Sequence, residues 1–224
     1  IRVYLKDRRE NLDGLLGKAT YYFPIFEQYL DKFDLPLEIK YLAVVESALN
    51  PSAISPSGAK GLWQFMYGTG LEYNLQIDSY VDERYDYLKS TEAACAYLQK
   101  LYKTFNDWDL ALAAYNSGPG NVKKAIKRAG GNTNYWEIRQ FLPRETQSYV
   151  PAFYATFYLF SYAAYHGLKP QKSELGYYET DTVHIKQSLS FESIHKGIGI
   201  DNDLLKALNP QYKKEHIPQV KERR

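Results

Sequence analysis

The sequence predicts a mainly α-helical protein with a small α+β unit at its C-terminal end. Apolar residues recur at helical spacing through most of the first 165 residues, and no strand-like alternation occurs before residue 180. Composition becomes polar over Gly167–Tyr178, and two short strand-like segments, Thr182–Lys186 and Ile217–Val220, then flank two short helices. The expected division is a helical domain over 1–168, a linker over 169–180 and a strand-helix-helix-strand module over 181–224.

Start and stop signals delimit the first helices. Helical spacing favours one or two amphipathic helices over Asn11–Phe33, ahead of Pro36. A buried helix is expected to end just before Pro51, because the residue preceding a proline is disfavoured in the α region. The segment Pro51–Gly61 is rich in proline, serine and glycine and predicts a structured loop. Helicity is expected to resume over 62–70, followed by an irregular stretch over 71–89.

Capping residues indicate where the later helices begin. Ser90 can cap a helix that runs to about Phe105, and Asp107 can cap the next one. A further helix is expected over 121–129, where a glycine pair breaks it. A long aromatic helix then ends at His166-Gly167.

One carboxylate stands in an unusual place. On a helical wheel centred on Ile39, Glu46 falls inside the apolar stripe that Leu35, Leu42 and Leu49 form. A glutamate on such a face is costly unless it is paired, neutral or functional. Desolvation and the negative end of the helix dipole both favour its protonated form, which a general acid needs near neutral pH. The alternative is a structural glutamate bonded to the backbone of the following loop.

Composition excludes several classes of function. A formal charge of +2 gives no basis for a nucleic-acid or membrane-surface partner. Cys95 is the only cysteine and lies in a helical pattern, which predicts a core residue rather than a disulfide or a metal cluster. The four histidines show no ligand-like clustering. Tyrosine is abundant, with 22 residues, and suits core edges and sugar-binding surfaces equally well.

Targeting and membrane signals are weak in this sequence. The N-terminal IRVYLKDRRE lacks the pattern of a signal peptide. The longest apolar stretch, Tyr149–Tyr165, is short for a membrane span and contains Pro151, so a core helix is expected there. An export signal or a membrane attachment would need a segment that is absent from this chain.

Four short motifs follow one another in a set order. They are Glu46-Ser47, Gly61-Leu62-Trp63-Gln64, Ala114-Tyr115-Asn116, and Glu145-Thr146 followed by Tyr149-Val150. Together they resemble the soluble-lytic-transglycosylase family over roughly residues 20–165. The GLWQF form and Val81–Arg84 are most similar to its membrane-bound type D branch. The resemblance implies a lysozyme-like helical fold that cuts the MurNAc–GlcNAc bond of peptidoglycan without adding water.

The resemblance also implies roles for individual residues. Glu46 is the expected catalytic acid, and Ser47 either positions it or is a plain helix hydroxyl. Gln64 is expected to contact the N-acetyl group of the sugar. Tyr115 and Asn116 are expected to line the cleft beside Glu46, with the tyrosine hydroxyl near the carboxyl.

Other candidates have competing structural interpretations. Glu145 matches the second glutamate that the family places near its cleft, but it could instead cap the aromatic helix from its first turn. Trp63 is expected in the core rather than as a sugar platform. Solvated loops or structural ion pairs are favoured for the remaining carboxylates. These are Asp78, Asp82, Glu83 and Asp86.

The implied chemistry uses one carboxyl group, whereas ordinary glycosidases use two. Glu46 would protonate the glycosidic oxygen and then take the proton of the C6 hydroxyl of the same MurNAc, which closes a 1,6-anhydro ring. The N-acetyl group of the substrate would stabilise the positive charge between the two steps. This scheme needs no metal and no organic cofactor.

The C-terminal unit resembles a LysM module. Its opening strand, its first helix at Ser188–Ile194 and its second helix at Leu204–Pro210 match that pattern, but Lys186-Gln187 replace the usual Gly-Asp. The unit is therefore either a glycan-binding module or a packing element. Peptidoglycan glycan strands are the expected partner, and the resemblance places the protein in the periplasm or cell envelope.

Three functions remain open at this point. A lytic transglycosylase is favoured by the motifs. A hydrolytic lysozyme (muramidase) with the same fold would need a group that activates water. A non-catalytic peptidoglycan-binding protein would be expected to lack the acid, and Glu46 is present.

Overall fold

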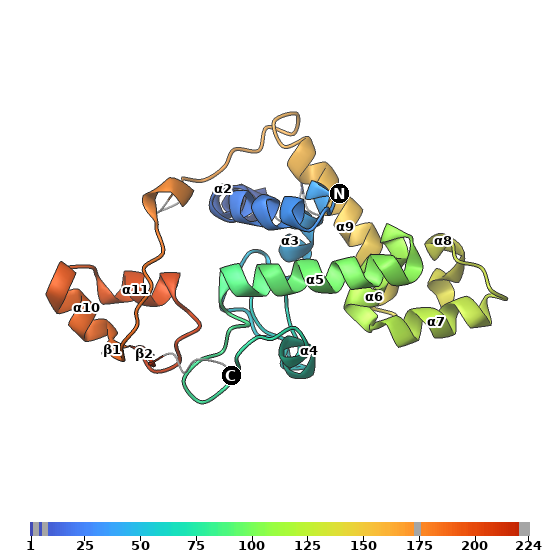
Figure 1. The fold of residues 1–224 in the computed structure, drawn as a ribbon. Coiled ribbons are helices and arrows are strands. Elements are labelled where there is room, and N and C mark those ends of the chain that lie inside the picture. Colours follow the sequence, from blue (N-terminus) through green and yellow to red (C-terminus); the bar gives the residue numbers. More distant parts are fainter. Residues whose placement is uncertain (2–4, 6–8, 173–175, 220–224) are drawn as a thin grey trace.

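The computed structural model of the chain describes all residues except 2–4, 6–8, 173–175 and 220–224. It shows a helical body followed by a small α+β module (Figure 1). The body consists of α2 (Arg9–Lys32), η1 (Leu37–Lys40), α3 (Tyr41–Ser47), α4 (Tyr67–Glu72), α5 (Tyr87–Phe105), α6 (Trp108–Ser117), α7 (Pro119–Arg128), α8 (Tyr135–Ile138), η2 (Arg139–Phe141) and α9 (Thr146–Ser161). The remainder consists of η3 (Tyr177–Glu179), β1 (Leu189–Ser190), α10 (Phe191–Ile198), α11 (Asn202–Leu208) and β2 (His216–Ile217).

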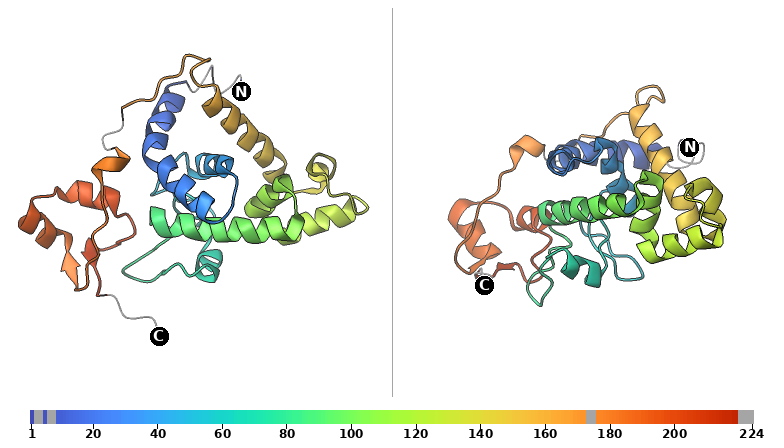
Figure 2. Two further views of the ribbon diagram at one scale, coloured as in Figure 1. Left: turned by 45° about the horizontal axis from the view of Figure 1, so that its top comes forward. Right: turned by 45° about the vertical axis from the view of Figure 1, so that its right-hand side comes forward.

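The core lies around two apolar helices, α3 and α6. Figure 2 shows α2, α5 and α9 framing the short α3, and α6 packs against both α5 and α9. Leu42 in α3 and Leu110 in α6 are fully buried. Trp63 and Cys95 belong to the same core, as the sequence predicts, and the indole Nε1 of Trp63 donates to Thr91 Oγ1 at 2.8 Å. Burial of these apolar side chains stabilises the helical body.

Several helix boundaries differ from the sequence-based expectations. Ser90 does not cap α5, because that helix begins at Tyr87 and the carboxylate of Asp86 accepts from two N–H groups of its first turn. The aromatic helix α9 ends at Ser161, and turns continue the chain to Gly167. Residues 62–65 are not helical. They belong to a loop that closes on itself, and α4 begins only at Tyr67.

Buried ion pairs hold the irregular stretch between α4 and α5. Asp82 is fully buried and accepts from Arg84 Nε at 2.9 Å and from Arg84 Nη2 at 2.8 Å. Lys60 Nζ lies 3.3 Å from the same carboxylate, and Glu83 pairs with Lys89. Burial alone would raise the pKa of Asp82, but Arg84 and Lys60 hold it below its ordinary value. These carboxylates therefore have structural roles, in agreement with the sequence analysis.

The C-terminal module contains two short strands, which pair with each other. Leu189 and Ser190 of β1 lie opposite Ile217 and His216 of β2 in an antiparallel register. The opening strand predicted over 182–186 is wrong. That segment is irregular, since it pairs with no strand of the described structure, and Val183 is 77% exposed. The predicted returning strand is observed at Ile217, whereas its last residue, Val220, lies outside the described part.

The module contacts the helical body through backbone pairing. Val81 and Tyr212 form an antiparallel bridge. The N–H of Asp82 donates to Gln211 O at 2.9 Å, and the N–H of Lys213 donates to Tyr80 O at 2.9 Å. Because Asp82 also holds Lys60 and Arg84, the docked module and the buried ion pairs stabilise the same loop.

Breaking the buried ion pair should be far more damaging than breaking an exposed one. Asp82→Asn leaves the buried Arg84 guanidinium without its carboxylate, and we expect a loss of about 3–5 kcal/mol in the free energy of unfolding. The control is Glu72→Gln, which breaks an exposed pair with Lys100 and should lose at most about 1 kcal/mol. Urea unfolding of both variants measures the difference. Equal losses would contradict a structural role for Asp82.

Candidate active site

Glu46 lies in the last turn of α3, next to a sharp change in chain direction. The two residues that follow the helix, Ala48 and Leu49, are both left-handed, with φ values of 52° and 53°. The helix therefore ends before Asn50, earlier than the Asn-Pro signal predicts. Left-handed backbone is unfavourable for residues other than glycine. The surrounding core must stabilise this turn, and Leu49 is in fact fully buried.

The Glu46 carboxyl holds its proton near neutral pH. Burial is the main cause and raises its pKa, the hydroxyl of Tyr149 donates a hydrogen bond to Oε1 and lowers it, and the charge of Glu145 raises it again. The resulting pKa is about 7. The sequence analysis predicts the direction of this shift and its desolvation cause. The contributions of Tyr149 and Glu145 depend on the packing of α9 against α3.

Two tyrosine hydroxyls lie beside this carboxyl. Tyr149 is buried on α9, and Tyr115 lies on α6. Burial, together with the charge of Glu46, raises the pKa of each well above its ordinary value, so both remain hydrogen-bond donors. Tyr149 donates to Glu46, whereas Tyr115 donates to Trp63 O at 2.8 Å. The hydroxyl that contacts the acid is therefore that of Tyr149, not that of Tyr115. The sequence analysis names Tyr149 only as part of the closing motif.

The loop over 51–65 packs against the end of α3. The hydroxyl of Ser47 lies 2.9 Å from Leu62 O and 3.0 Å from Ala43 O, so it joins the loop to the helix and not to the Glu46 carboxyl. Lys60 forms backbone bridges to Ile54 and to Phe65. These contacts fix the loop beside Glu46.

Within this loop, Gln64 and Gly61 have unusual backbone conformations. Gln64 has a φ of 49°, and its Nε2 lies 2.9 Å from Gly61 O. Gly61 has a φ of 78°, and a Cβ there would lie 1.8 Å from Arg84 O. Only glycine allows this close approach. The Arg84 guanidinium also donates to Gly58 O at 3.2 Å and so ties the loop to the buried ion pairs.

Asn116 lies in the last turn of α6, facing the start of α9. Its Oδ1 accepts from Thr146 Oγ1 at 2.7 Å, so Thr146 orients the amide. Glu145 directly precedes α9 and is exposed. Within the described structure its side chain bonds none of the first N–H groups of that helix, so the capping alternative is wrong as a hydrogen-bonded cap.

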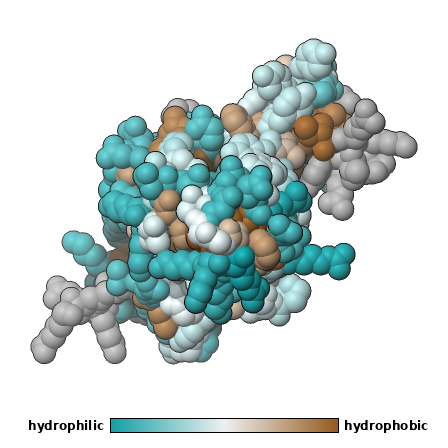
Figure 3. Space-filling model, turned by 90° about the vertical axis from the view of Figure 1, so that its right-hand side faces the viewer, coloured by the Kyte–Doolittle hydropathy of each residue, from teal (hydrophilic) through white to brown (hydrophobic). Residues whose placement is uncertain are grey.

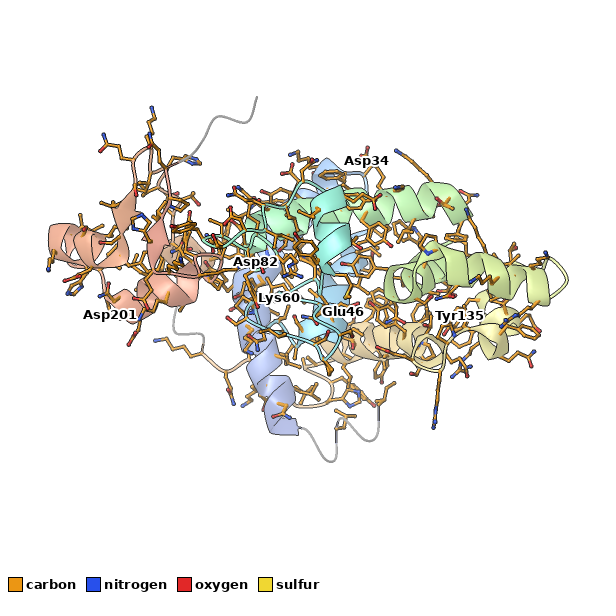
Figure 4. The ribbon with its side chains drawn as sticks, turned by 90° about the horizontal axis from the view of Figure 1, so that it is seen from below. Asp34, Glu46, Lys60, Asp82, Tyr135 and Asp201 are labelled. Atoms are coloured by element: carbon orange, nitrogen blue, oxygen red, sulfur yellow. The ribbon has the colours of Figure 1, made fainter. Side chains whose placement is uncertain are left out.

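The structure brings some of the candidate residues together at Glu46. Figure 4 shows Glu46 in the middle of the molecule, with Lys60 and Asp82 to one side and Tyr135 to the other. Tyr115, Tyr149 and Glu145 all act electrostatically on Glu46 or respond to its charge. Tyr149 and Thr146 are functional candidates that the sequence analysis did not single out. Both belong to the closing motif and lie one helical turn apart, and this spacing could have indicated that they share one face of the helix.

Neither a metal centre nor a membrane span is visible in the described ranges. Among those residues, no group of three or more His, Cys, Asp or Glu side chains is arranged to hold a metal ion. No helix of the described part is both long enough and apolar enough to cross a bilayer.

The raised pKa makes a signed prediction about stability. Between about pH 4.5 and 7 the folded protein keeps a proton on Glu46 that the unfolded chain loses, so stability falls as pH rises through this interval. Glu46→Gln removes the charge. We expect the free energy of unfolding of this variant to exceed that of the wild type by about 2–3 kcal/mol at pH 8, and the difference to disappear toward pH 4.

Denaturant unfolding at pH 4 and pH 8 measures this gap. The matched control is Glu38→Gln, which replaces an exposed glutamate in η1 near the same helix. A gap for Glu46→Gln that does not grow with pH, or that equals the gap for the control, would show that the Glu46 carboxyl is not desolvated.

Comparison with known proteins identifies related chains. Two family models match: one described as "Transglycosylase SLT domain" over residues 24–138, and one described as "Lytic transglycosylase MltD, LysM-like domain" over residues 179–224. Membrane-bound lytic murein transglycosylase D of Escherichia coli (strain K12) is 34% identical, over 98% of this chain and 52% of its own length. Membrane-bound lytic murein transglycosylase F of Histophilus somni (strain 2336) is 32% identical, over 61% of this chain and 29% of its own.

Solved structures give the same result for the fold. The 70 kDa soluble lytic transglycosylase of Escherichia coli superposes with a TM-score of 0.54 and 30% identity, over 64% of this chain and 24% of that one. The same type of enzyme in complex with bulgecin A gives a TM-score of 0.54 and 28% identity, over 68% and 26% of the two chains. The expected lysozyme-like helical fold is thereby confirmed.

The extent of these matches settles the family. The chain spans about half the length of the type D relatives that it matches. The SLT model covers just over half of this chain, including the segments that carry Glu46, Gln64 and Asn116, and the LysM-like model covers the C-terminal module. This protein therefore belongs to the transglycosylase SLT domain family.

Proposed function

We propose that this protein is a peptidoglycan lytic transglycosylase, which cleaves the MurNAc–GlcNAc bond and leaves 1,6-anhydroMurNAc ends. The observation that carries the proposal is the Glu46 carboxyl. It is desolvated, keeps its proton up to about pH 7, and accepts a hydrogen bond from the hydroxyl of Tyr149. A carboxyl group with this pKa can act first as an acid and then as a base at neutral pH.

In the first step, Glu46 donates its proton to the glycosidic oxygen as the bond from that oxygen to C1 of MurNAc breaks. The departing sugar leaves as an alcohol, and positive charge develops at C1. The carbonyl oxygen of the substrate's own N-acetyl group stabilises this charge. Tyr149 holds the carboxyl in place, because its hydroxyl remains a donor while Glu46 loses its proton.

In the second step, the Glu46 carboxylate accepts the proton of the C6 hydroxyl on the same MurNAc. The C6 oxygen then forms a bond to C1, which closes the anhydro ring and returns Glu46 to its protonated form. Atoms and charge balance without water. One carboxyl thus performs both proton transfers, and the reaction needs no second group to activate a nucleophile.

Three further residues are proposed to bind the glycan, and a fourth is proposed to hold the loop that carries one of them. Gln64, whose Nε2 is engaged by the backbone of its own loop, accepts the N-acetyl N–H through Oε1. Asn116, oriented by Thr146, donates through its amide nitrogen. Tyr115 forms part of the surface beside Glu46, and Ser47 acts indirectly by holding the loop over 51–65 against α3.

Hydrolysis in the manner of lysozyme is a second candidate, because Glu145 lies near Glu46. Its carboxylate is exposed and close enough for its charge to raise the pKa of Glu46. A second carboxylate beside the acid could activate a water molecule. Under the favoured mechanism, Glu145 only keeps Glu46 protonated. The two candidates differ in their products.

We propose that residues 1–168 carry the activity and that 169–180 connect them to a module over 181–224. The proposed site residues all lie in the first part. The end of the connecting segment contacts α2, since Gln28 Nε2 donates to the hydroxyl of Tyr177 at 2.8 Å. Because the proposed substrate is the cell wall, the protein would act in the periplasm or cell envelope. The backbone docking of the module onto 80–82 supports a packing role beside any glycan binding.

Glu46→Gln should lower turnover by orders of magnitude while preserving the fold. The variant removes both proton-transfer roles, so we expect release of muropeptides from purified peptidoglycan to fall by about a hundredfold to ten-thousandfold. Circular dichroism checks the fold, and Glu38→Gln, an exposed change near the same helix, should keep wild-type turnover. Near-wild-type release of muropeptides by a folded Glu46→Gln protein would contradict the assignment of Glu46 as the acid.

The products should end in anhydro sugars. If the C6 hydroxyl is the nucleophile, mass spectrometry of a digest should find fragments one water mass lighter than those of a lysozyme. A digest dominated by reducing MurNAc ends, lost on changing Glu145 to Gln, would establish the hydrolytic candidate instead.

A further inference from the structure

A pocket of about 290 Å³ lies between α7 and the turn that joins η2 to α9. We call it the α7 pocket. Its lining combines two cations, one amide and three apolar side chains: Asn121, Lys124, Arg128, Phe141, Leu142 and Pro143. Asn121, Lys124 and Arg128 share one face of α7, because they are spaced by three and four residues. The opposite wall, from η2 and the turn, is apolar.

The two cations of the α7 pocket have no acidic partner in the described structure. Lys124 and Arg128 are both exposed, and no Asp or Glu of the described residues lies within 4 Å of either. In a second pocket of the described structure, the one lining cation, Lys89, is paired with Glu83. The helix dipole favours Arg128 in the last turn of α7, but Lys124 lies outside that turn. The pocket therefore offers uncompensated positive charge.

One end of the α7 pocket adjoins the chain next to Asn116, a residue of the proposed site. Asn121 Nδ2 donates to the carbonyl of Ser117 at 2.8 Å, and Ser117 directly follows Asn116. On the other wall, Pro143 lies two residues before Glu145. From Asn121 to Arg128 the helix rises by about 10 Å. Figure 3 looks onto this end of the molecule, where hydrophilic side chains gather with apolar ones between them.

We propose that the α7 pocket binds a free carboxylate of the peptide that MurNAc carries in peptidoglycan. This inference rests on the proposed function, which brings the glycan to Glu46. A peptide on a MurNAc residue near Asn116 would extend outward, and about three extended residues span the 10 Å length of the pocket. Arg128 can bind a carboxylate through two parallel N–H groups, and Lys124 contributes a point charge. Phe141 and Pro143 contact the aliphatic part of the peptide.

The test compares two pairs of charge removals on the same helix. The pocket variant is Lys124→Gln with Arg128→Gln. The matched control is Lys123→Gln with Lys127→Gln, which removes the same charge from exposed positions of α7 that do not line the pocket. Each enzyme is assayed on soluble glycan strands that carry peptides and on the same strands after an amidase has removed the peptides.

The expected readout is the preference for peptide-bearing strands, measured as the ratio of KM on stripped strands to KM on peptide-bearing strands. In the pocket variant this ratio should fall about threefold to tenfold, since two exposed charge contacts are lost. In the control it should equal the wild-type ratio. An unchanged ratio in the pocket variant, or an equal fall in the control, would overturn the proposal.

Two further arms identify the ligand and separate this proposal from the proposed function. Amidation of the peptide carboxylates should lower the wild-type ratio to that of the pocket variant. Competition by inorganic phosphate that is equally strong on stripped strands would instead indicate a phosphate site and overturn the peptide assignment. Binding of peptide-bearing strands to Glu46→Gln protein tests the pocket without turnover. Absence of anhydro products from the wild type refutes only the proposed function.

Discussion

The hydrogen bond from Tyr149 to Glu46 joins the two helices on which the proposed site depends. It connects α9 to the last turn of α3, where the carboxyl is withdrawn from water. Burial raises the pKa of Glu46 more than this hydrogen bond lowers it, which leaves the pKa at about 7. A strongly lowered pKa would remove the acid, and an unsupported carboxyl would lose its orientation. The chemistry therefore depends on a balance between desolvation and one buried donor.

The surroundings of Glu46 are held by a scaffold that is separate from the chemistry. Asp82 binds Arg84 and Lys60 in the interior, and Arg84 reaches carbonyl groups of the loop over 51–65. The same stretch pairs with Tyr212 of the C-terminal module. Charges that a sequence reader would count as a possible second catalytic carboxylate thus support the loop that carries Gln64. The module is attached to this scaffold rather than to the acid.

Periodicity and motif order predict the helical fold and the environment of Glu46, because both depend on local apolar spacing. They fail at helix boundaries, where several capping and stop signals compete, and where distant segments decide the structure. Asp86, not Ser90, caps α5, and two left-handed residues end α3 before the proline signal acts. The role of Tyr149 arises from the packing of helices about a hundred residues apart in sequence, which no local pattern encodes. The short strand at 189–190 is likewise defined by its partner, His216–Ile217.

Titration of the Glu46 carboxyl in the wild-type protein tests the account most directly. The chemical shift of its carboxyl carbon, assigned by its disappearance in Glu46→Gln, can be followed by NMR as a function of pH. Desolvation partly offset by Tyr149 predicts a midpoint near pH 7. A midpoint near the ordinary value of 4.5 would show a solvated carboxylate, which could not serve as a general acid at neutral pH.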